Sequence, residues 1–397
     1  MSSGVWNTTT LGVIAEIVMG QSPSGDTCNE AGDGIPLLNG PTEFGNNNPS
    51  QIQFTTDPKK IAEEGDLLFC VRGSTTGRMN WADQKYAIGR GLAALRHRSG
   101  YSFQPFLKGI IDSYLPLLLA EATGSTFPNV SSQQLNNLTI EVPDLHTQRR
   151  IADILSALDE KIELNRQTNA TLEAIAHAIF KEWFVDFRFP GATGEMQDSE
   201  LGPIPRGWRA GRIGDICELN PKLTLRKGAI SKYVEMKNLS QCLLSIEEPR
   251  EREFVSGSKF QNGDTIFARI APCLENGKTG FVDFLADLEI GWGSTEFIVL
   301  RGRNYINPYF IYCLSRLSNF REFAIQSMVG SSGRQRVVES ILSDYPTVIP
   351  DQETVNNFLK VVEQLFFQVK NNSDQSATVA KIRDALLPKL MSGEIEV

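Results

Sequence analysis

Apolar residues recur along one face of segment 144–186 at the 3.5-residue spacing of a coiled coil. The segment contains no Gly and no internal Pro, and Asp144, which follows Pro143, is a suitable helix N-cap. About 40 residues at 1.5 Å per residue would form a rod of roughly 60 Å. One helix cannot bury such a seam alone, so the pattern predicts a second helix. The seam residues are Ile151, Leu155, Leu158, Ile162, Leu172, Ala176, Ile179 and Trp183.

A second segment, 351–392, repeats this pattern and starts after Pro350 as the first starts after Pro143. With the two prolines aligned, Asn165 in the middle of the first seam falls on Asn372 in the second. A buried Asn in such a seam costs stability and fixes the register of pairing. The shared phase and shared polar interruption favour a pair of matched helices over two unrelated amphipathic helices. The second seam comprises Val355, Phe358, Val362, Leu365, Val369, Val379, Leu386 and Leu390.

The remaining chain forms two blocks that repeat each other. Gly65-Asp66 precedes an apolar run of strand length, and Gly263-Asp264 precedes another. The whole chain is therefore predicted to be two copies of a mixed α/β domain, each followed by a long helix, with an internal two-fold repeat. Divergent polar loops on a shared framework suggest two recognition surfaces with different targets. The expected parts are a first domain at 1–142, a helix at 143–187, a linker at 188–207, a second domain at 208–349 and a helix at 350–397.

Turn signals and apolar runs also predict shorter elements. A short strand is predicted from Leu11 to the break at Gly20, and a helix over 106–119 after Pro105. The last strand of the first domain is predicted over 138–142. The linker contains four Gly and three Pro, so it is expected to have little regular structure.

Composition limits the class of protein. No run of 18 apolar residues predicts a membrane span, and the N-terminus lacks the features of a secretory signal. The six cysteines are scattered and include no C-x-x-C pair, which argues against zinc and fits a reducing cytoplasm. The net charge of −8 argues against simple nucleic-acid binding. However, residues 65–100 carry six Lys or Arg against two acids, and residues 206–237 carry eight against three.

Motifs of catalysis and of nucleotide binding are not evident: the sequence has no Walker A loop, H-E-x-x-H, G-x-S-x-G or G-x-G-x-x-G. Residues 307–310 (NPYF) are close to the Asn-Pro-Pro-Phe/Tyr motif of adenine methyltransferases but lack the second proline. The repeated position reads Gln104-Pro105-Phe106, so a helix N-cap followed by Pro is the simpler interpretation. No catalytic residue and no metal ligand is therefore expected in this chain.

The best candidates for nucleic-acid contacts lie in loops. Residues 72–78 (RGSTTGR) combine Arg with small hydroxyl side chains, which suit phosphate oxygens and base edges, although an ordinary polar turn has the same composition. Arg269 is interpreted as the equivalent of Arg72 in the second copy. The full set of candidates is Arg72, Ser74, Thr75, Thr76, Arg78, Arg90, Lys222, Arg226, Lys227, Arg269, Lys278, Arg334 and Arg336.

Several stretches resemble one known family along the length of the chain. They are 148–152 (QRRIA), 178–187 (AIFKEWFVDF), 201–208 (LGPIPRGW) and 386–395 (LLPKLMSGEI). The chain thus resembles the specificity (S) subunits of type I restriction–modification systems. It departs from the family at 352–355 (QETV), where an acid–Gln pair is common, but the apolar seam continues there.

The resemblance implies two target recognition domains held apart by two antiparallel helices, each domain reading one half of a split site in double-stranded DNA. It also implies that the helices set the spacing and dock two methyltransferase (M) subunits, which restriction (R) subunits join. S-adenosylmethionine, ATP and Mg²⁺ would then act in the partner subunits, with no cofactor in this chain. Two alternatives stay open: a DNA adenine methyltransferase with built-in recognition domains, and a coiled-coil assembly protein that does not bind DNA.

Overall fold

The protein is described by a computed structural model that covers residues 6–45, 47–122, 128–247, 249–331 and 333–397. The chain divides into two compact units. Unit 1 comprises residues 1–162 and 378–397, and unit 2 comprises residues 163–377. Each unit contains one globular domain and a part of both long helices. Within the covered residues, no helix has the length and apolar character needed to cross a membrane.

The two long helices are α4 (Leu145–Phe184) and α9 (Gln352–Met391), close to the predicted ranges. Each starts with the predicted aspartate cap, since Asp144 accepts from the backbone N–H of Thr147 (3.0 Å) and Asp351 from that of Thr354 (2.9 Å). Both caps satisfy backbone donors that the first helical turn leaves free.

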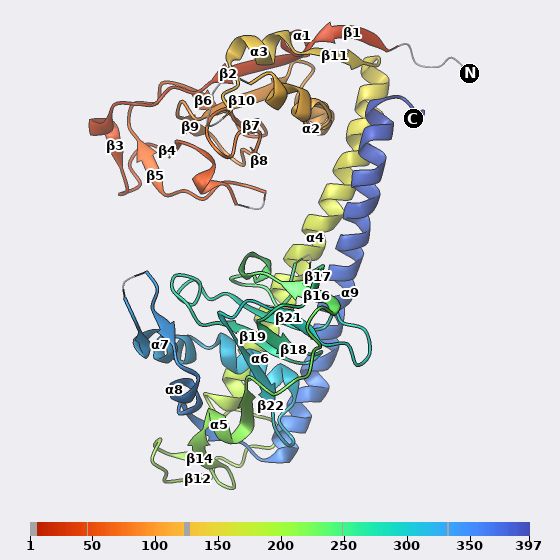
Figure 1. Cartoon of the computed structure of the whole chain (residues 1–397). Coiled ribbons are helices and arrows are strands. Elements are labelled where there is room, and N and C mark those ends of the chain that lie inside the picture. Colours follow the sequence, from red (N-terminus) through yellow and green to blue (C-terminus); the bar gives the residue numbers. More distant parts are fainter. Residues whose placement is uncertain (1–5, 46, 123–127, 248, 332) are drawn as a thin grey trace. The chain divides into compact units, whose positions relative to one another are not determined.

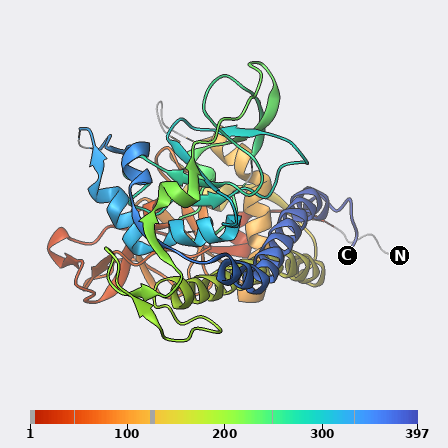
Figure 2. The same cartoon turned by 90° about the horizontal axis from the view of Figure 1, so that it is seen from below.

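In unit 2 the end of α4 pairs with the start of α9, and in unit 1 the start of α4 pairs with the end of α9 (Figures 1 and 2). The rings of Phe180 and Phe358 lie 5.6 Å apart in unit 2. In unit 1 the guanidinium of Arg383 donates to Asp159 at 2.7 Å. The helices therefore run antiparallel in both units, as expected.

The globular domain of unit 1 contains three sheets (Figure 1). Strands β1 and β11 pair, a four-stranded sheet has the order β2-β10-β7-β8, and a five-stranded sheet has the order β3-β5-β4-β9-β6, in which β4 and β9 run parallel. The strands are β1 (Asn7–Thr10), β2 (Ala15–Met19), β3 (Cys28–Asn29), β4 (Ile35–Leu38), β5 (Gln53–Thr55), β6 (Ile61–Ala62), β7 (Leu67–Cys70), β8 (Met79–Trp81), β9 (Tyr86–Ile88), β10 (Leu92–His97) and β11 (Thr139–Val142). The helices are α1 (Leu11–Ile14), η1 (Gly25–Thr27), η2 (Pro41–Glu43), η3 (Tyr101–Phe103), α2 (Gln104–Ala120) and α3 (Ser132–Asn137).

The domain of unit 2 repeats this topology. Within the described residues, the pair β14-β25 and the sheet β15-β22-β19-β20 correspond to the strand pair and the four-stranded sheet of unit 1. The sheet β17-β16-β21-β18 corresponds to β5-β4-β9-β6, without a strand in the place of β3, and β16 and β21 again run parallel. The predicted internal repeat is thus confirmed at the level of strand order. The strands are β12 (Met196–Gln197), β13 (Ile204–Pro205), β14 (Arg209–Arg212), β15 (Cys217–Leu219), β16 (Ile230–Val234), β17 (Arg250–Glu253), β18 (Ser258–Phe260), β19 (Thr265–Ala268), β20 (Thr279–Phe281), β21 (Gly291–Gly293), β22 (Phe297–Gly302), β23 (Met328–Val329), β24 (Arg336–Val337) and β25 (Pro346–Ile349). The helices are α5 (Ile213–Ile216), η4 (Met236–Asn238), α6 (Pro308–Arg316), α7 (Ser318–Gln326) and α8 (Glu339–Ser343).

Apolar packing joins each domain to the helix segments of its own unit. In unit 1, Phe106 and Leu107 of α2 share a buried cluster with Ile151 and Leu155 of α4. In unit 2 the corresponding cluster is richer in aromatic rings, and Phe310 lies 5.0 Å from Phe180. The seam of the long helices therefore serves both the helix pair and the domains.

Three local expectations differ from the structure. Residues 11–14 form the helical turn α1 between β1 and β2, because Ala15 N–H bonds back to the carbonyl of Leu11, and the strand starts only at Ala15. Helix α3 was not predicted, although Ser131 and Gln134 form a capping box before it. The linker contains the short hairpin β12–β13, and Ile204 within it is buried.

Candidate nucleic-acid interface

The loop after β7 has a defined shape, and Thr76, one of the predicted contact residues, helps to hold it. The hydroxyl of Thr76 donates to the carbonyls of Gly73 and Pro128, both at 2.8 Å. Gly73 and Gly77 both have positive φ, a conformation that favours glycine. Because its hydroxyl is bound to two carbonyls, Thr76 shapes the loop rather than extending from it.

Arg78 also has a structural position. Its guanidinium donates to the carbonyl of Pro41 (3.1 Å) and to that of Phe44 (2.9 Å). The neighbouring strand β8 adds to this connection, because the side chain of Asn80 donates to the carbonyl of Gly45 (3.0 Å). Side chains of the β7–β8 hairpin therefore fix the loop 72–78 to the segment 41–45, which contains η2.

Arg72, Ser74 and Arg90 are exposed at one end of the sheet. The N–H of Val71 donates to the carbonyl of Gly91 at 2.9 Å, so Arg72 and Arg90 lie next to this connection at the ends of adjacent strands. In the described part of the chain, neither guanidinium has a hydrogen-bond or ion-pair partner. Thr75 is also exposed, and its hydroxyl has a weak contact with the thiol of Cys70 at 3.7 Å.

The second domain differs from the prediction at Arg269. The carbonyl of Val71 accepts from Val130, and the carbonyl of Arg269 accepts from Val337, at 2.9 Å in each case. Arg269 therefore corresponds to Val71, and the equivalent of Arg72 is Ile270. The one-residue error arose because the loops after β7 and β19 share no sequence pattern. Within the described residues, the buried Nε of Arg269 has no hydrogen-bond partner.

Two further candidates in this domain are engaged by the protein itself. The guanidinium of Arg336 forms an ion pair with Glu296 at 2.7 Å. The ammonium of Lys278 donates to the carbonyl of Met236 in η4 at 2.9 Å. Lys278 is the counterpart of Arg78. The carbonyl of Arg78 accepts from the backbone N–H of Cys70 at the end of β7, and the carbonyl of Lys278 accepts from that of Ala268 at the end of β19.

Three of the predicted contact residues of the second domain lie in the segment 221–229 between β15 and β16. Lys222, Arg226 and Lys227 are exposed, and their side chains have no partner among the described residues. The ammonium of Lys259 donates to the carbonyl of Leu223 (3.0 Å) and anchors this segment to the domain. Arg334 is exposed too. The exposed candidate cations of the first domain thus lie beside the end of β7, and three of those in the second domain follow β15.

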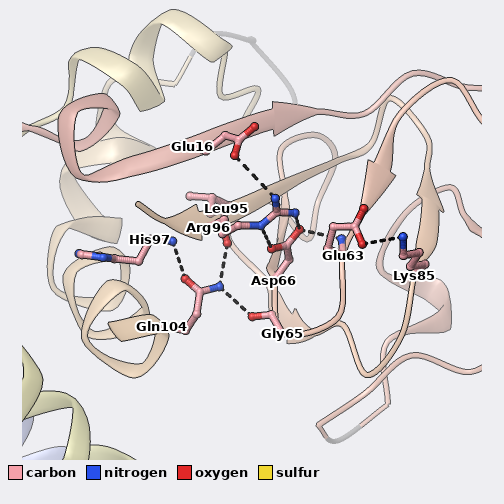
Figure 3. Close-up of polar contacts among 9 residues, drawn as sticks. All are labelled: Glu16, Glu63, Gly65, Asp66, Lys85, Leu95, Arg96, His97 and Gln104. Atoms are coloured by element: carbon pink, nitrogen blue, oxygen red, sulfur yellow. Dashed lines mark hydrogen bonds and ion pairs between the residues drawn. The ribbon is translucent and has the colours of Figure 1, made fainter. Parts of the chain in front are cut away.

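A buried ion pair supports each domain, and the prediction did not include it. The guanidinium of Arg96 donates to both carboxylate oxygens of Asp66 (2.7 and 2.8 Å), whose side chain is 1% exposed (Figure 3). The same carboxylate accepts from the backbone N–H of Glu63 at 2.8 Å. Pairing with Asp66 raises the pKa of Arg96. The repeated Gly-Asp dipeptide was the available sequence signal for this pair.

The second domain has the same pair. Arg301 donates to both oxygens of Asp264, each at 2.7 Å, and Asp264 accepts from the backbone N–H of Gln261 at 2.8 Å. Burial raises the pKa of Asp264, while hydrogen bonding to Asp264 raises that of Arg301. These pairs fix the turn before β7 or β19 and so support the strand that leads into each loop.

The segment 307–310 has the structural role expected for a helix start. The side chain of Asn307 accepts from the backbone N–H of Phe310 at 2.9 Å, and Pro308 occupies the first turn of α6. Asn307 is 8% exposed. Its side-chain oxygen is therefore used by the helix cap.

Comparison with known proteins finds similarity to one family. The family model described as "Type I restriction modification DNA specificity domain" matches residues 4–174. The type I restriction enzyme MjaIX specificity subunit of Methanocaldococcus jannaschii is 29% identical over 73% of this chain and 70% of its own length. The type I restriction enzyme HindI specificity subunit of Haemophilus influenzae is 23% identical over 85% of this chain and 88% of its own.

A solved structure has the same architecture. The crystal structure of the type I restriction–modification S subunit from M. genitalium aligns with a TM-score of 0.57 at 16% sequence identity, covering 98% of this chain and 97% of that chain. The duplicated α/β domain with two long helices is therefore a fold that this chain shares with that structure. The chain is thus similar in sequence and in fold to specificity subunits of type I restriction–modification systems. These similarities do not favour the alternative of a methyltransferase with built-in recognition domains.

Proposed function

We propose that this chain provides the DNA sequence specificity of a type I restriction–modification complex. Each globular domain would read one half of a bipartite site in double-stranded DNA. The paired helices would set the spacing between the halves and dock two methyltransferase subunits, which restriction subunits join. The sequence similarity to type I restriction–modification specificity subunits and the duplicated fold support this proposal.

One observation carries the proposal. The two domains share a strand order and each contains an equivalent buried ion pair, but they expose different cations. Arg72 and Arg90 are exposed in the first domain, and Lys222, Arg226 and Lys227 in the second. A common framework with different surface chemistry is what two half-sites of different sequence require. We assign Arg72, Ser74, Thr75, Arg90, Lys222, Arg226, Lys227, Arg269 and Arg334 to DNA contact, and Thr76, Arg78, Lys278 and Arg336 to support of the loops.

The chain is proposed to have no catalytic role of its own. Methyl transfer from S-adenosylmethionine would occur in the methyltransferase subunits, and ATP- and Mg²⁺-dependent steps in the restriction subunits. The complex would act in the cytoplasm, where the chromosomal DNA of a prokaryote lies. Methylation of DNA by the purified chain alone would instead support the methyltransferase alternative.

Mapping of DNA methylation in cells tests the proposal. Cells that express this chain with a type I methyltransferase subunit from the same source are compared with cells that express that subunit alone. A split methylated motif is expected only when this chain is present, and it would give both half-sites at once. If the proteins copurify and the wild-type chain yields no motif, the assignment of specificity to this chain is wrong. If they do not copurify, the docking role of the helices is wrong.

A further inference from the structure

A buried acidic residue lies where the second domain packs on the helices of unit 2. Glu173 is on α4, beside the seam residue Leu172, and is 2% exposed. Its neighbour Leu172 packs against the apolar cluster of unit 2, and its hydrogen-bond partners Leu244 and Tyr312 belong to that cluster. A carboxylate in such a place costs free energy unless its oxygens accept hydrogen bonds.

Both carboxylate oxygens of Glu173 accept hydrogen bonds from the second domain. One accepts from the backbone N–H of Leu244 and the other from the hydroxyl of Tyr312, each at 2.9 Å. Tyr312 is fully buried on α6. One helix side chain thus contacts a loop and a helix of the domain together.

Neighbouring contacts hold the same loop from other sides. The hydroxyls of Ser245 and of Ser373 on α9 lie 2.8 Å apart. Arg316 of α6 donates to the carbonyl of Gln241 (2.7 Å) and to that of Gly277 (2.9 Å). The loop 240–245 is therefore fixed to α4, α9 and α6 by directional bonds.

Apolar packing alone would allow the domain to rotate or slide on the helices, because it depends little on direction. Hydrogen bonds to a charged group are directional and stronger than neutral ones. The repeat that aligns Leu172 with Val379 puts Ala380 at the position that matches Glu173. An alanine cannot make such bonds, so this contact is a feature of the second domain.

We propose that Glu173 is a positioning residue that sets the orientation of the second recognition domain on the helix pair, and through it the spacer length that the complex accepts. This inference rests on the proposed function. Burial of the Glu173 carboxyl group disfavours its charged form and raises its pKa to about 7. His177, one turn further along α4, stays neutral because burial lowers its pKa to about 4. Tyr312, Cys313 and Arg316 are the other titratable or charged groups that face Glu173.

The test uses the complex of the full chain with its methyltransferase subunits. Methylation rates are compared on DNA with the native spacer and on DNA with a spacer one base pair longer or shorter. Glu173→Leu removes the hydrogen bonds and keeps the volume similar, so the preference for the native spacer should fall about ten-fold. Glu173→Gln should retain most of the preference, because its amide accepts from Leu244 and donates to Tyr312. Glu182→Leu, at an exposed position of the same helix, should behave as wild type.

Each outcome is informative. If the Glu173→Leu complex assembles and keeps the native spacer preference, the inference is overturned. If that variant does not fold, Tyr312→Phe removes one donor with its ring in place, and an unchanged spacer preference there overturns the inference equally. Recognition of the first half-site serves as an internal control, because it should stay unchanged in every variant. If the wild-type complex methylates no split site, the proposed function itself fails.

Discussion

At the scale of single residues, the two domains use a buried carboxylate in the same way. Asp66 and Asp264 each bind a guanidinium and close the turn before a central strand. Isolated charges are costly in a protein interior, so removal of one partner is more damaging than absence of the pair. Exposed cations such as Arg72 and Arg90 keep their contact with water, so they need no ion-pair partner in the protein.

Replacement of Arg96 by Leu should destabilise the first domain by about 3 kcal/mol, because it leaves the carboxylate of Asp66 buried without its cation. Urea unfolding of the full chain, followed by hydrogen exchange of β7 and β10, measures the destabilisation. Lys85→Ala is the control, since Lys85 forms an exposed ion pair with Glu63 (3.1 Å) and should change stability by less than about 0.5 kcal/mol. Equal effects of the two substitutions would contradict this account of the buried pair (Figure 3).

Glu173 should make the stability of unit 2 depend on pH. Burial raises its pKa from 4.5 to about 7, so between these values the folded chain binds more protons than the unfolded chain and stability falls as pH rises. Wild type should lose roughly 3 kcal/mol relative to Glu173→Gln between pH 4.5 and 7.5. The lowered pKa of His177 acts in both proteins and cancels in the difference. A difference in unfolding free energy that is constant over this range would show that Glu173 is not buried as described.

The cations of 221–229 should strengthen DNA binding by neutralising phosphates. Conversion of Lys222, Arg226 and Lys227 to Ala should reduce the slope of log Kd against log salt by about 0.9 for each phosphate that the variant no longer neutralises. The preferred sequence should not change, because phosphate contacts carry no direct sequence information. Lys237→Ala is the control, since Lys237 already pairs with Glu235 at 2.7 Å. An unchanged slope in the triple variant would remove this segment from the interface.

The predicted contact residues differ in how the folded protein uses their side chains, and the sequence did not indicate these differences. An Arg that will extend into solvent and one that will bind a carbonyl look alike in a sequence. Arg78 and Arg336 were predicted to contact DNA, but one binds the carbonyls of Pro41 and Phe44 and the other binds Glu296. Their partners are distant in the chain, so no local pattern indicated them.

At the scale of elements, regular repeats were predictable and short elements were not. The 3.5-residue seam predicted α4 and α9 to within a few residues, because many positions contribute to the same period. Helix α1 has four residues and offers no period to detect. Glu173 lies beside the seam and would read as a solvent-exposed position, because only the folded domain supplies Leu244 and Tyr312.

The predicted polar interruption of the seam is a layer of hydrogen bonds within unit 2. The amide of Asn372 donates to the side-chain oxygen of Asn169 at 2.9 Å. The amide of Asn165 donates to the carbonyl of Asn372 (3.2 Å) and to Gln375 (3.0 Å). Such a layer specifies one register of two helices at a cost in stability.

A double-mutant cycle tests this layer. Asn372→Leu alone should cost about 1–3 kcal/mol, because the side chain of Asn169 loses its buried donor. Addition of Asn169→Leu should recover most of this stability, since two facing leucines pack without unsatisfied groups. The measurement is urea unfolding of each variant, with Asn371→Leu as an exposed control. Additive effects of the two substitutions would mean that the amides do not interact.

At the scale of the whole molecule, the two copies differ most in how their domains meet the helices and where their cations lie. If the helix pair sets the spacing of the two half-sites, the length of the helices must determine the number of base pairs between them. Insertion of one heptad keeps the seam in phase, whereas insertion of four residues turns one part of the helix relative to the other. A matched heptad insertion in both helices therefore changes length with little change in packing.

Seven residues inserted after Ile162 and seven before Thr378 should lengthen the helix pair by about 10.5 Å. The spacer of the methylated motif should then grow by about three base pairs at 3.4 Å each, with both half-sites unchanged. Methylation mapping of cells that express the variant with its methyltransferase subunit measures this directly. Seven residues inserted in the exposed linker after Ala192 form the control and should leave the spacer as it was. An active variant with longer helices and the original spacer would show that the spacing is set elsewhere, most directly by the partner subunits.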